Sequence, residues 1–198
     1  MDYESAANQI YDELLKFQLK YKSECPELGV LLSSLQAMSI LYKTFHWHSS
    51  GDNYYGDHLL YERLYNETYN EIDGLAEKML GLSGINYLVA LNPVLQIQTQ
   101  HFFVKGIAEW TKRGGDEVRD LPAYHAAAGL LSEKAFLCFV DCVMGALEES
   151  GRLTSGLSNM LEGIADLHEG HVYLLQQRIG KIVAEKSENL PEEKEEEI

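Results

Sequence analysis

Five histidine and carboxylate side chains lie within one stretch of the sequence, and the last four of them are at helical spacings behind a break at Gly51. The five are His46, His58, Glu62, Asp73 and Glu77. Positions 58 and 62 are four apart, and so are 73 and 77, so each pair shares one side of a helix. The eleven-residue step from 62 to 73 is close to three whole turns, which places both pairs on one broad face. Imidazole and carboxylate ligands together suit a borderline-to-hard divalent metal such as iron, so this stretch predicts a metal site.

A single helix cannot bring these two pairs to one ion. His58 and Asp73 are fifteen residues apart, and a rise of about 1.5 Å per residue separates them by roughly 22 Å. Bonds from metal to ligand are only about 2 Å long. If all five residues serve one centre, two copies of the helix must meet antiparallel across a two-fold axis. His46, His58 and Glu62 would then face two carboxylates of the partner subunit, those of its Asp73 and Glu77.

The same stretch carries further residues at fixed spacings. They are Trp47, Gly51, Tyr54, Tyr55 and Ala76. With the five candidate ligands they match, without insertion or deletion, a signature that runs roughly HWxxxGxxFxxxH, then an acidic residue four positions on, then DxxAE. The chain therefore resembles the Dps or mini-ferritin family of the ferritin-like superfamily. Glu62 stands where that family usually has Asp, which keeps a carboxylate but lengthens its reach by one methylene.

The resemblance implies a fold, an assembly and a cofactor. The expected fold is all-α, a ferritin-like four-helix bundle with one long crossover between helices 2 and 3, to which this chain adds an N-terminal helix. The expected assembly is a homododecamer with ferroxidase centres between two-fold-related subunits. The expected metal is iron (Fe²⁺/Fe³⁺), with zinc or manganese as alternatives. Trp47 is a candidate electron donor, because an indole beside an oxidising centre can give up an electron.

Iron oxidation and storage is therefore the predicted function. Carboxylates stabilise Fe³⁺ better than Fe²⁺, so a carboxylate-rich centre eases the oxidation of Fe²⁺ by peroxide or dioxygen. Consuming both reactants limits hydroxyl-radical chemistry, so protection against oxidative stress is the expected role of this oxidoreductase. Two alternatives from other classes stay open. One is a DNA-protecting coat protein, and the other is a non-catalytic ferritin-like shell whose metal centre is idle or holds zinc.

The charge of the chain argues against binding to nucleic acid. The sequence has 31 acidic and 16 basic residues and a formal net charge of −15. Affinity for DNA comes mostly from Lys and Arg side chains that neutralise phosphates. Both termini are acidic, with MDYESAANQIYDELL at the start and ENLPEEKEEEI at the end. We therefore expect iron chemistry without DNA binding, and the acidic pair Glu148 and Glu149 is a candidate for guiding cations inward.

Composition predicts one globular, helical, cytoplasmic domain. A length of 198 residues with 45% apolar content suffices for a single core, and only four prolines interrupt the chain. The first residues lack the apolar segment of a signal peptide, and we expect no run of roughly 20 apolar residues that would span a membrane. The odd count of three cysteines does not indicate a disulfide framework.

Apolar periodicity and breakers divide the chain into five expected helices. Their ranges are 3–22, 26–47, 54–81, 123–149 and 153–183. Residues 1–24 form an N-terminal helical extension, residues 25–184 the ferritin-like domain, and residues 185–198 an acidic tail. The connection over about 82–122 looks enlarged, and its segment from Thr99 to Lys112 is typical of a short helix.

A second cluster of histidines and acids lies in the last predicted helix. Its members are Asp166, His168, Glu169 and His171. His168 and His171 are three apart and are candidates for an accessory metal site. A di-iron site inside one bundle commonly uses E-x-x-H pairs from two helices. No Glu in this chain is followed three residues later by His, so this argument disfavours a site within one subunit.

Overall fold

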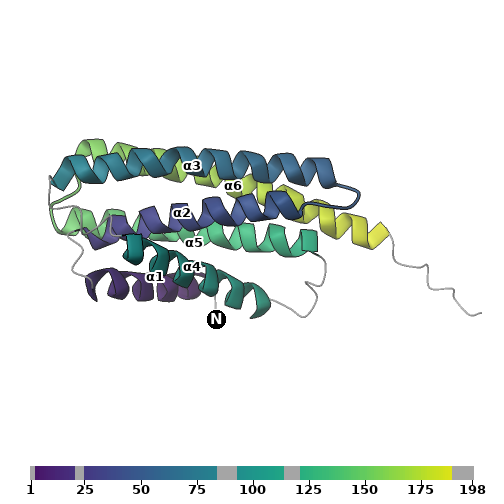
Figure 1. Ribbon diagram of the computed structural model, residues 1–198, viewed down its shortest axis with the longest axis horizontal. Helices are drawn as coiled ribbons and strands as arrows, with labels where there is room; N and C mark the ends of the chain where they lie inside the picture. Colours follow the sequence, from purple (N-terminus) through teal and green to yellow (C-terminus); the bar gives the residue numbers. More distant parts are fainter. Residues whose placement is uncertain (1–2, 21–24, 84–92, 114–120, 189–198) are drawn as a thin grey trace, which may run out of the picture.

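The computed structural model describes residues 3–20, 25–83, 93–113 and 121–188, and all regular secondary structure in these ranges is α-helical (Figure 1). The helices are α1 (Tyr3–Lys20), α2 (Pro26–His48), α3 (Tyr54–Ser83), α4 (Pro93–Arg113), α5 (Leu121–Glu149) and α6 (Ser155–Glu188). The prediction of an all-α chain is confirmed. Helix α6 runs four residues past the expected domain end at 184, and positions 189–198 of the expected acidic tail lie outside the described residues.

Helix α4 occupies the long connection between α3 and α5. It begins at Pro93, six residues before the expected helical run, because proline is well tolerated in the first turn of a helix. Polar side chains attach it to its neighbours. Gln18 of α1 donates from Nε2 to Thr99 Oγ1 at 3.2 Å, and Gln100 donates from Nε2 to Gln36 Oε1 of α2 at 2.6 Å.

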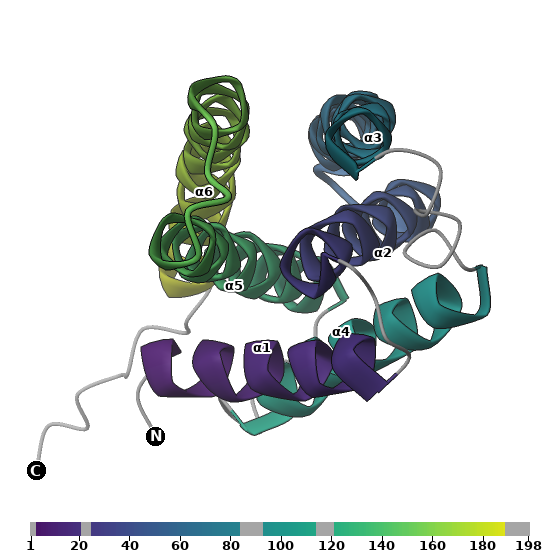
Figure 2. The same ribbon diagram turned by 90° about the vertical axis from the view of Figure 1, so that its left-hand side faces the viewer.

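Four helices run side by side along the long axis of the molecule, namely α2, α3, α5 and α6 (Figure 1). Figure 2, viewed along that axis, shows α3 and α6 at the top, α2 and α5 below them, and α1 and α4 as a further layer that crosses beneath. Direct contacts join α2 to α3, α5 to α6 and α2 to α5, and both α1 and α4 contact α2 and α5. The elements that carry the candidate ligands therefore surround one interior.

Helix α2 is the most enclosed of these elements. It contacts α1, α3, α4 and α5, and most of its residues are buried. It is also long and apolar enough to cross a membrane by length and composition, with 72% of the relevant window buried inside the protein. The expectation that no run approaches that length is thus wrong for α2. Its position among four helices accounts for the apolar character, since each side must pack against a neighbour.

Polar side chains connect α3 to α6 across the interior. Arg178 of α6 donates from Nε to Asp57 Oδ1 at 2.5 Å and from Nη2 to Oδ2 at 3.0 Å, and both residues are buried. Such a two-point contact fixes the angle as well as the distance between its partners. It therefore sets the register of α3 against α6 next to His58, the residue after Asp57.

Candidate metal centre

The turn between α2 and α3 brings two predicted ligands together. Helix α2 ends at His48 and α3 begins at Tyr54, and Gly51 between them has a φ of +80°, a left-handed conformation that favours glycine. The chain reverses there, so His46 lies against His58. The centroids of the two imidazole rings are 3.6 Å apart, with 27° between the ring planes. The turn therefore builds the histidine half of the predicted centre.

Hydrogen bonds to the backbone fix the tautomer of both rings. His46 donates from Nδ1 to the carbonyl oxygen of His58 at 2.9 Å, and His58 donates from Nδ1 to the carbonyl oxygen of His46 at 3.2 Å. A carbonyl oxygen only accepts, so each Nδ1 must carry the hydrogen. In a neutral ring, Nε2 then has a free lone pair, which is the form that binds a metal. We refer to His46 and His58 below as the surface pair.

The other predicted ligands lie further along α3. Glu62 is half-buried one turn after His58, whereas Asp73 and Glu77 are exposed. Because α3 is continuous from Tyr54 to Ser83, the separation of roughly 22 Å between His58 and Asp73 holds within one protomer. The structure thus brings His46 and His58 together and keeps Asp73 and Glu77 away from them. Sharing of the centre between two protomers stays a prediction.

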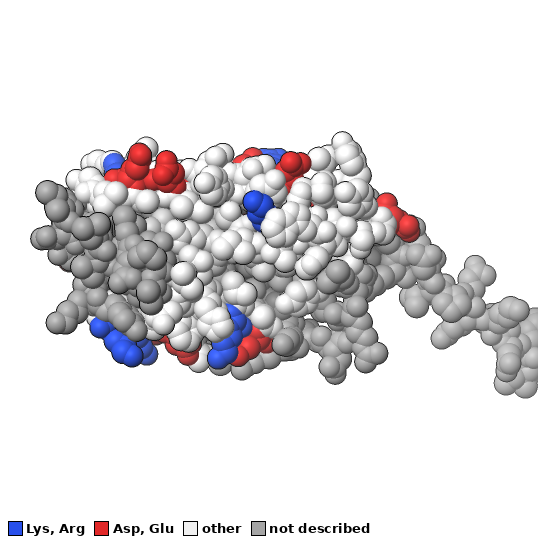
Figure 3. All heavy atoms as spheres, viewed as in Figure 1, with Lys and Arg blue, Asp and Glu red and all other residues white. Residues whose placement is uncertain are grey.

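The surroundings of the surface pair are aromatic and open. Trp47, the predicted electron donor, is 67% exposed, and Lys43 Nζ lies 5.7 Å from the centroid of its ring. Tyr65 meets the ring of His46 edge-on at 5.4 Å, and Tyr54 lies 5.1 Å from the ring of His58. On the face seen in Figure 3, acidic side chains form separate groups along the upper edge, with Lys or Arg side chains beside them.

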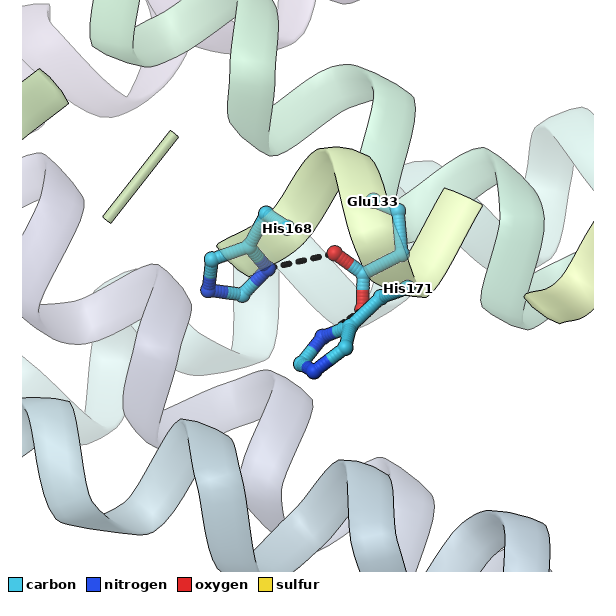
Figure 4. Close-up of side chains that lie close together, drawn as sticks. All are labelled: Glu133, His168 and His171. Carbon is cyan, nitrogen blue, oxygen red and sulfur yellow. Dashed lines mark hydrogen bonds and ion pairs between the residues drawn. The ribbon is translucent and has the colours of Figure 1, made fainter. Parts of the chain in front are cut away.

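A second group of candidate ligands is buried inside the protomer. Glu133 of α5 lies between His168 and His171 of α6 (Figure 4), and the three offer ligand atoms within 4.8 Å of one another. His168 donates from Nδ1 to Glu133 Oε2 at 2.5 Å, and Nδ1 of His171 lies 3.1 Å from Oε1 of the same carboxylate. Tyr42 of α2 donates its hydroxyl to Glu133 Oε1, also at 2.5 Å. The carboxylate of Glu133 therefore accepts from three side chains.

Helix α3 supplies two carboxylates on the other side of this group. Nε2 of His168 lies 2.9 Å from Glu71 Oε2, and Nε2 of His171 lies 2.8 Å from Glu67 Oε2. The histidine and Glu133 side chains are at most 1% exposed, whereas Glu71 is 13% and Glu67 is 30% exposed. We call Glu67, Glu71, Glu133, His168 and His171 the buried cluster. It is closed on the α5 side and reachable from the α3 side.

Charge interactions within the buried cluster outweigh the effect of burial. Burial disfavours a charge on His168, but Glu133 and Glu71 raise its pKa to about 10. Burial likewise disfavours a charge on Glu133, but His168 and His171 lower its pKa to about 2. Burial and the neighbouring Glu133 raise the pKa of Tyr42 well above its usual value. The metal-free protein therefore holds an imidazolium and a carboxylate side by side in its interior.

Sequence reasoning found only part of the buried cluster. It singled out His168 and His171, but it grouped them with Asp166 and Glu169, which are exposed. The search for E-x-x-H pairs missed the arrangement because its carboxylates come from α3 and α5 and its histidines from α6. Two signals were present in the sequence. Glu67 and Glu71 are four apart on one face of α3, and the polar run Ser132, Glu133 and Lys134 interrupts a mostly apolar part of α5.

One segment of the chain is similar in sequence to a known protein. General stress protein 20U of Bacillus subtilis (strain 168) is 40% identical to this chain over 47 residues, which cover 24% of this chain and 32% of that protein. The matched segment thus spans about a third of the length of this relative. No protein-family model and no solved structure matches the chain. The similarity therefore covers a short segment of a protein whose name refers to general stress.

Proposed function

We propose that the protein is an iron-binding ferroxidase of the Dps type, which oxidises Fe²⁺ with peroxide or dioxygen at a centre shared by two protomers. The reciprocal hydrogen bonding of the surface pair carries this proposal. It leaves the Nε2 lone pairs of His46 and His58 available to a metal. Glu62, one turn further along, adds a carboxylate. One protomer thus offers two nitrogens and one carboxylate for Fe²⁺.

The proposed fold is a ferritin-like bundle made of α2, α3, α5 and α6. These helices lie side by side, and the connection between the second and third of them is the long one, with α4 inside it. That connectivity is typical of bundles with a single crossover. Helix α1 is then the N-terminal extension.

The remaining ligands come from the partner subunit in this proposal. An antiparallel contact of α3 with α3 of a second copy places its exposed Asp73 and Glu77 opposite the surface pair. Large apolar side chains are exposed around that face, as expected for an interaction surface. They are Trp47, Tyr54, Tyr55, Leu59 and Tyr69. We extend the assembly to a closed homo-oligomer, a dodecamer, in the cytoplasm.

Iron is the substrate of the proposed reaction. Two Fe²⁺ each give up one electron, and one peroxide molecule accepts both electrons and two protons to leave as two waters. The carboxylates of Glu62 and of the partner subunit's Asp73 and Glu77 favour the more highly charged product. Trp47 is proposed as an electron donor beside the centre. The net charge of −15 supports a role without DNA, and the stress protein named above is in keeping with a role in oxidative stress.

Single substitutions test the proposed ligands. Anaerobic Fe²⁺ titration followed by peroxide should show an oxidation rate reduced at least about tenfold in His58→Ala and in Asp73→Ala, since loss of a ligand or its orienting partner commonly costs 10- to 100-fold. His101→Ala, which changes an exposed histidine of α4, is the matched control and should oxidise Fe²⁺ normally. An unchanged rate in either of the first two variants would refute the assignment.

Mixing the two variants tests the sharing between protomers. When His58→Ala and Asp73→Ala chains assemble together at random, about one centre in four receives an intact His58 and an intact Asp73 from different chains. Activity should therefore return to about a quarter of the wild-type value. If both residues act within one chain, mixing restores nothing, and the shared centre is wrong.

A further inference from the structure

The buried cluster lies within a single protomer and draws on three helices. Glu67 and Glu71 come from α3, Glu133 from α5, and His168 and His171 from α6. The fold has brought three carboxylates and two imidazoles into contact beside a core of apolar side chains. Burying such groups is costly unless each is paired or bound to a metal. The proposed interface centre does not explain why these five side chains lie together inside the protomer.

Glu133 determines which nitrogens of the cluster face a ligand. Its two carboxylate oxygens lie against the Nδ1 atoms of His168 and His171, one oxygen to each ring. Tyr42 donates to the same carboxylate and to the carbonyl oxygen of Gly129, which holds Glu133 in place. A histidine that ligates a metal commonly donates its other ring N–H to a carboxylate in this way. Both Nε2 atoms are therefore directed toward α3.

The atoms opposite these nitrogens are carboxylate oxygens. In the metal-free protein, the imidazolium of His168 donates from both ring nitrogens, from Nδ1 to Glu133 and from Nε2 to Glu71. Nε2 of His168 lies 2.9 Å from Glu71 Oε2, and Nε2 of His171 lies 2.8 Å from Glu67 Oε2. A divalent cation bound by these nitrogens and oxygens takes the place of a proton, because ligands release their protons when they bind a metal. Neighbouring ligands around an ion with bonds of about 2.1 Å are about 3 Å apart, so each of these two nitrogen–oxygen pairs has the separation of two neighbouring ligands.

The α3 side also provides a route for an ion. Glu67 is 30% exposed, and its Oε1 accepts from Nε of Arg63, which is itself 56% exposed, at 3.0 Å. Displacing this surface side chain opens the carboxylates to solvent. A metal site requires ligand atoms and an entry path for the ion. The buried cluster has both.

We propose that Glu67, Glu71, His168 and His171 bind one divalent transition-metal ion within each protomer, with Glu133 and Tyr42 as positioning residues. Two imidazole nitrogens and two carboxylate oxygens suit Fe²⁺, Mn²⁺, Co²⁺ or Zn²⁺ better than Mg²⁺ or Ca²⁺, which prefer oxygen alone. This site goes beyond the proposed interface centre, because it needs no second subunit and shares no ligand with it.

The test uses the full-length chain carrying His58→Ala and Asp73→Ala, so that the interface centre is removed. Metal-free protein is titrated with Co²⁺, and the visible absorption of bound Co²⁺ and the metal retained after gel filtration are measured. We expect one Co²⁺ per protomer, competed away by Zn²⁺. Adding Glu67→Gln and Glu71→Gln should weaken binding at least about tenfold. Both changes are on the partly exposed side, and circular dichroism checks that the helices persist.

A matched control replaces Glu169 by Gln in the same background. Glu169 follows His168 on α6, but its side chain is exposed and it is a ligand in neither proposal, so Co²⁺ binding should not change. The proposal is overturned if the starting protein retains no Co²⁺, or if the Glu67→Gln and Glu71→Gln changes leave binding intact. Neither outcome bears on iron oxidation at the interface, which is measured in chains with an intact surface pair.

Discussion

The surface pair and the buried cluster both orient two histidines toward a metal, but they use different hydrogen-bond acceptors to do so. In each, two histidines have Nδ1 held by an acceptor, so that Nε2 faces a prospective ligand. The surface pair uses backbone carbonyls of its own helices, whereas the buried cluster uses a carboxylate that is fully buried. The arrangement of the surface pair buries no charged acceptor, and its donor set needs the carboxylates of a partner subunit. The buried cluster places charge in the interior and completes the donor set within one chain.

This difference assigns different roles to the two regions. The carbonyl oxygen of His46 also accepts from the backbone N–H of Ser49 at 3.4 Å, and the carbonyl oxygen of His58 lies inside the continuous helix α3. The surface pair should therefore contribute little to stability. The buried charges depend on one another, since removal of one partner leaves another without compensation. Substitutions should therefore affect assembly and iron oxidation in the first region and folding and metal retention in the second.

The largest effect is expected for Glu133→Ala in the metal-free protein. It removes the common acceptor of His168, His171 and Tyr42, and loss of one partner from a buried charged group typically costs about 3–5 kcal/mol. The matched change in the surface pair, His58→Ala, should cost less than about 1 kcal/mol. Urea unfolding followed by circular dichroism measures both. Equal losses would contradict the division between the two regions.

A smaller effect is expected from His125, a third buried histidine beside His168 and His171. His125 stacks on Phe45 with ring centroids 4.3 Å apart, and burial together with His48 lowers its pKa from 6.5 to about 4. Its stabilisation is therefore present above pH 6.5 and is lost as the pH falls toward 4. Wild type should lose about 2 kcal/mol more than His125→Leu between pH 7 and pH 5. Thermal unfolding of both proteins at the two pH values measures this difference. Equal losses in the two proteins would show that His125 has the same pKa in the folded and the unfolded chain, which contradicts the prediction.

Tyr42→Phe should have an effect of about 1–2 kcal/mol, because it removes one hydrogen bond to a charged group. It should also weaken Co²⁺ binding at the buried cluster several-fold, since a positioning residue acts through the ligand it holds. Iron oxidation at the interface should not change. Tyr61→Phe, another buried tyrosine of the core, is the control. A loss of oxidation in Tyr42→Phe alone would connect the two regions in a way that the geometry does not indicate.

The smallest effect is expected for Arg63→Ala. The ion pair of Arg63 with Glu67 is between residues four apart on an exposed part of α3, and such pairs contribute about 0.3–0.5 kcal/mol. Stability should therefore hardly change, whereas Co²⁺ should associate faster because the route to Glu67 is open. Stopped-flow absorption measures the association rate. A rate equal to that of wild type would place the route elsewhere.

Sequence reasoning reached the helical class and the surface pair because the information is local. Four- and three-residue spacings define the helices, and the proximity of His46 and His58 follows from a short turn at Gly51. It did not reach the buried cluster, because Glu67, Glu133 and His168 are 66 and 35 residues apart in turn and only packing joins them. The same limit applies to α2, whose apolar character depends on how many neighbours surround it.

One consequence follows from the uninterrupted course of α3. This helix carries His58 and Glu62, then Glu67 and Glu71, then Asp73 and Glu77, so the backbone itself measures the distance between the two regions, about 14 Å from position 58 to position 67. Insertion of one residue between 63 and 66 would turn everything beyond it by about 100°. The length of that short segment is thus constrained as tightly as any ligand, although none of its side chains needs to touch a metal.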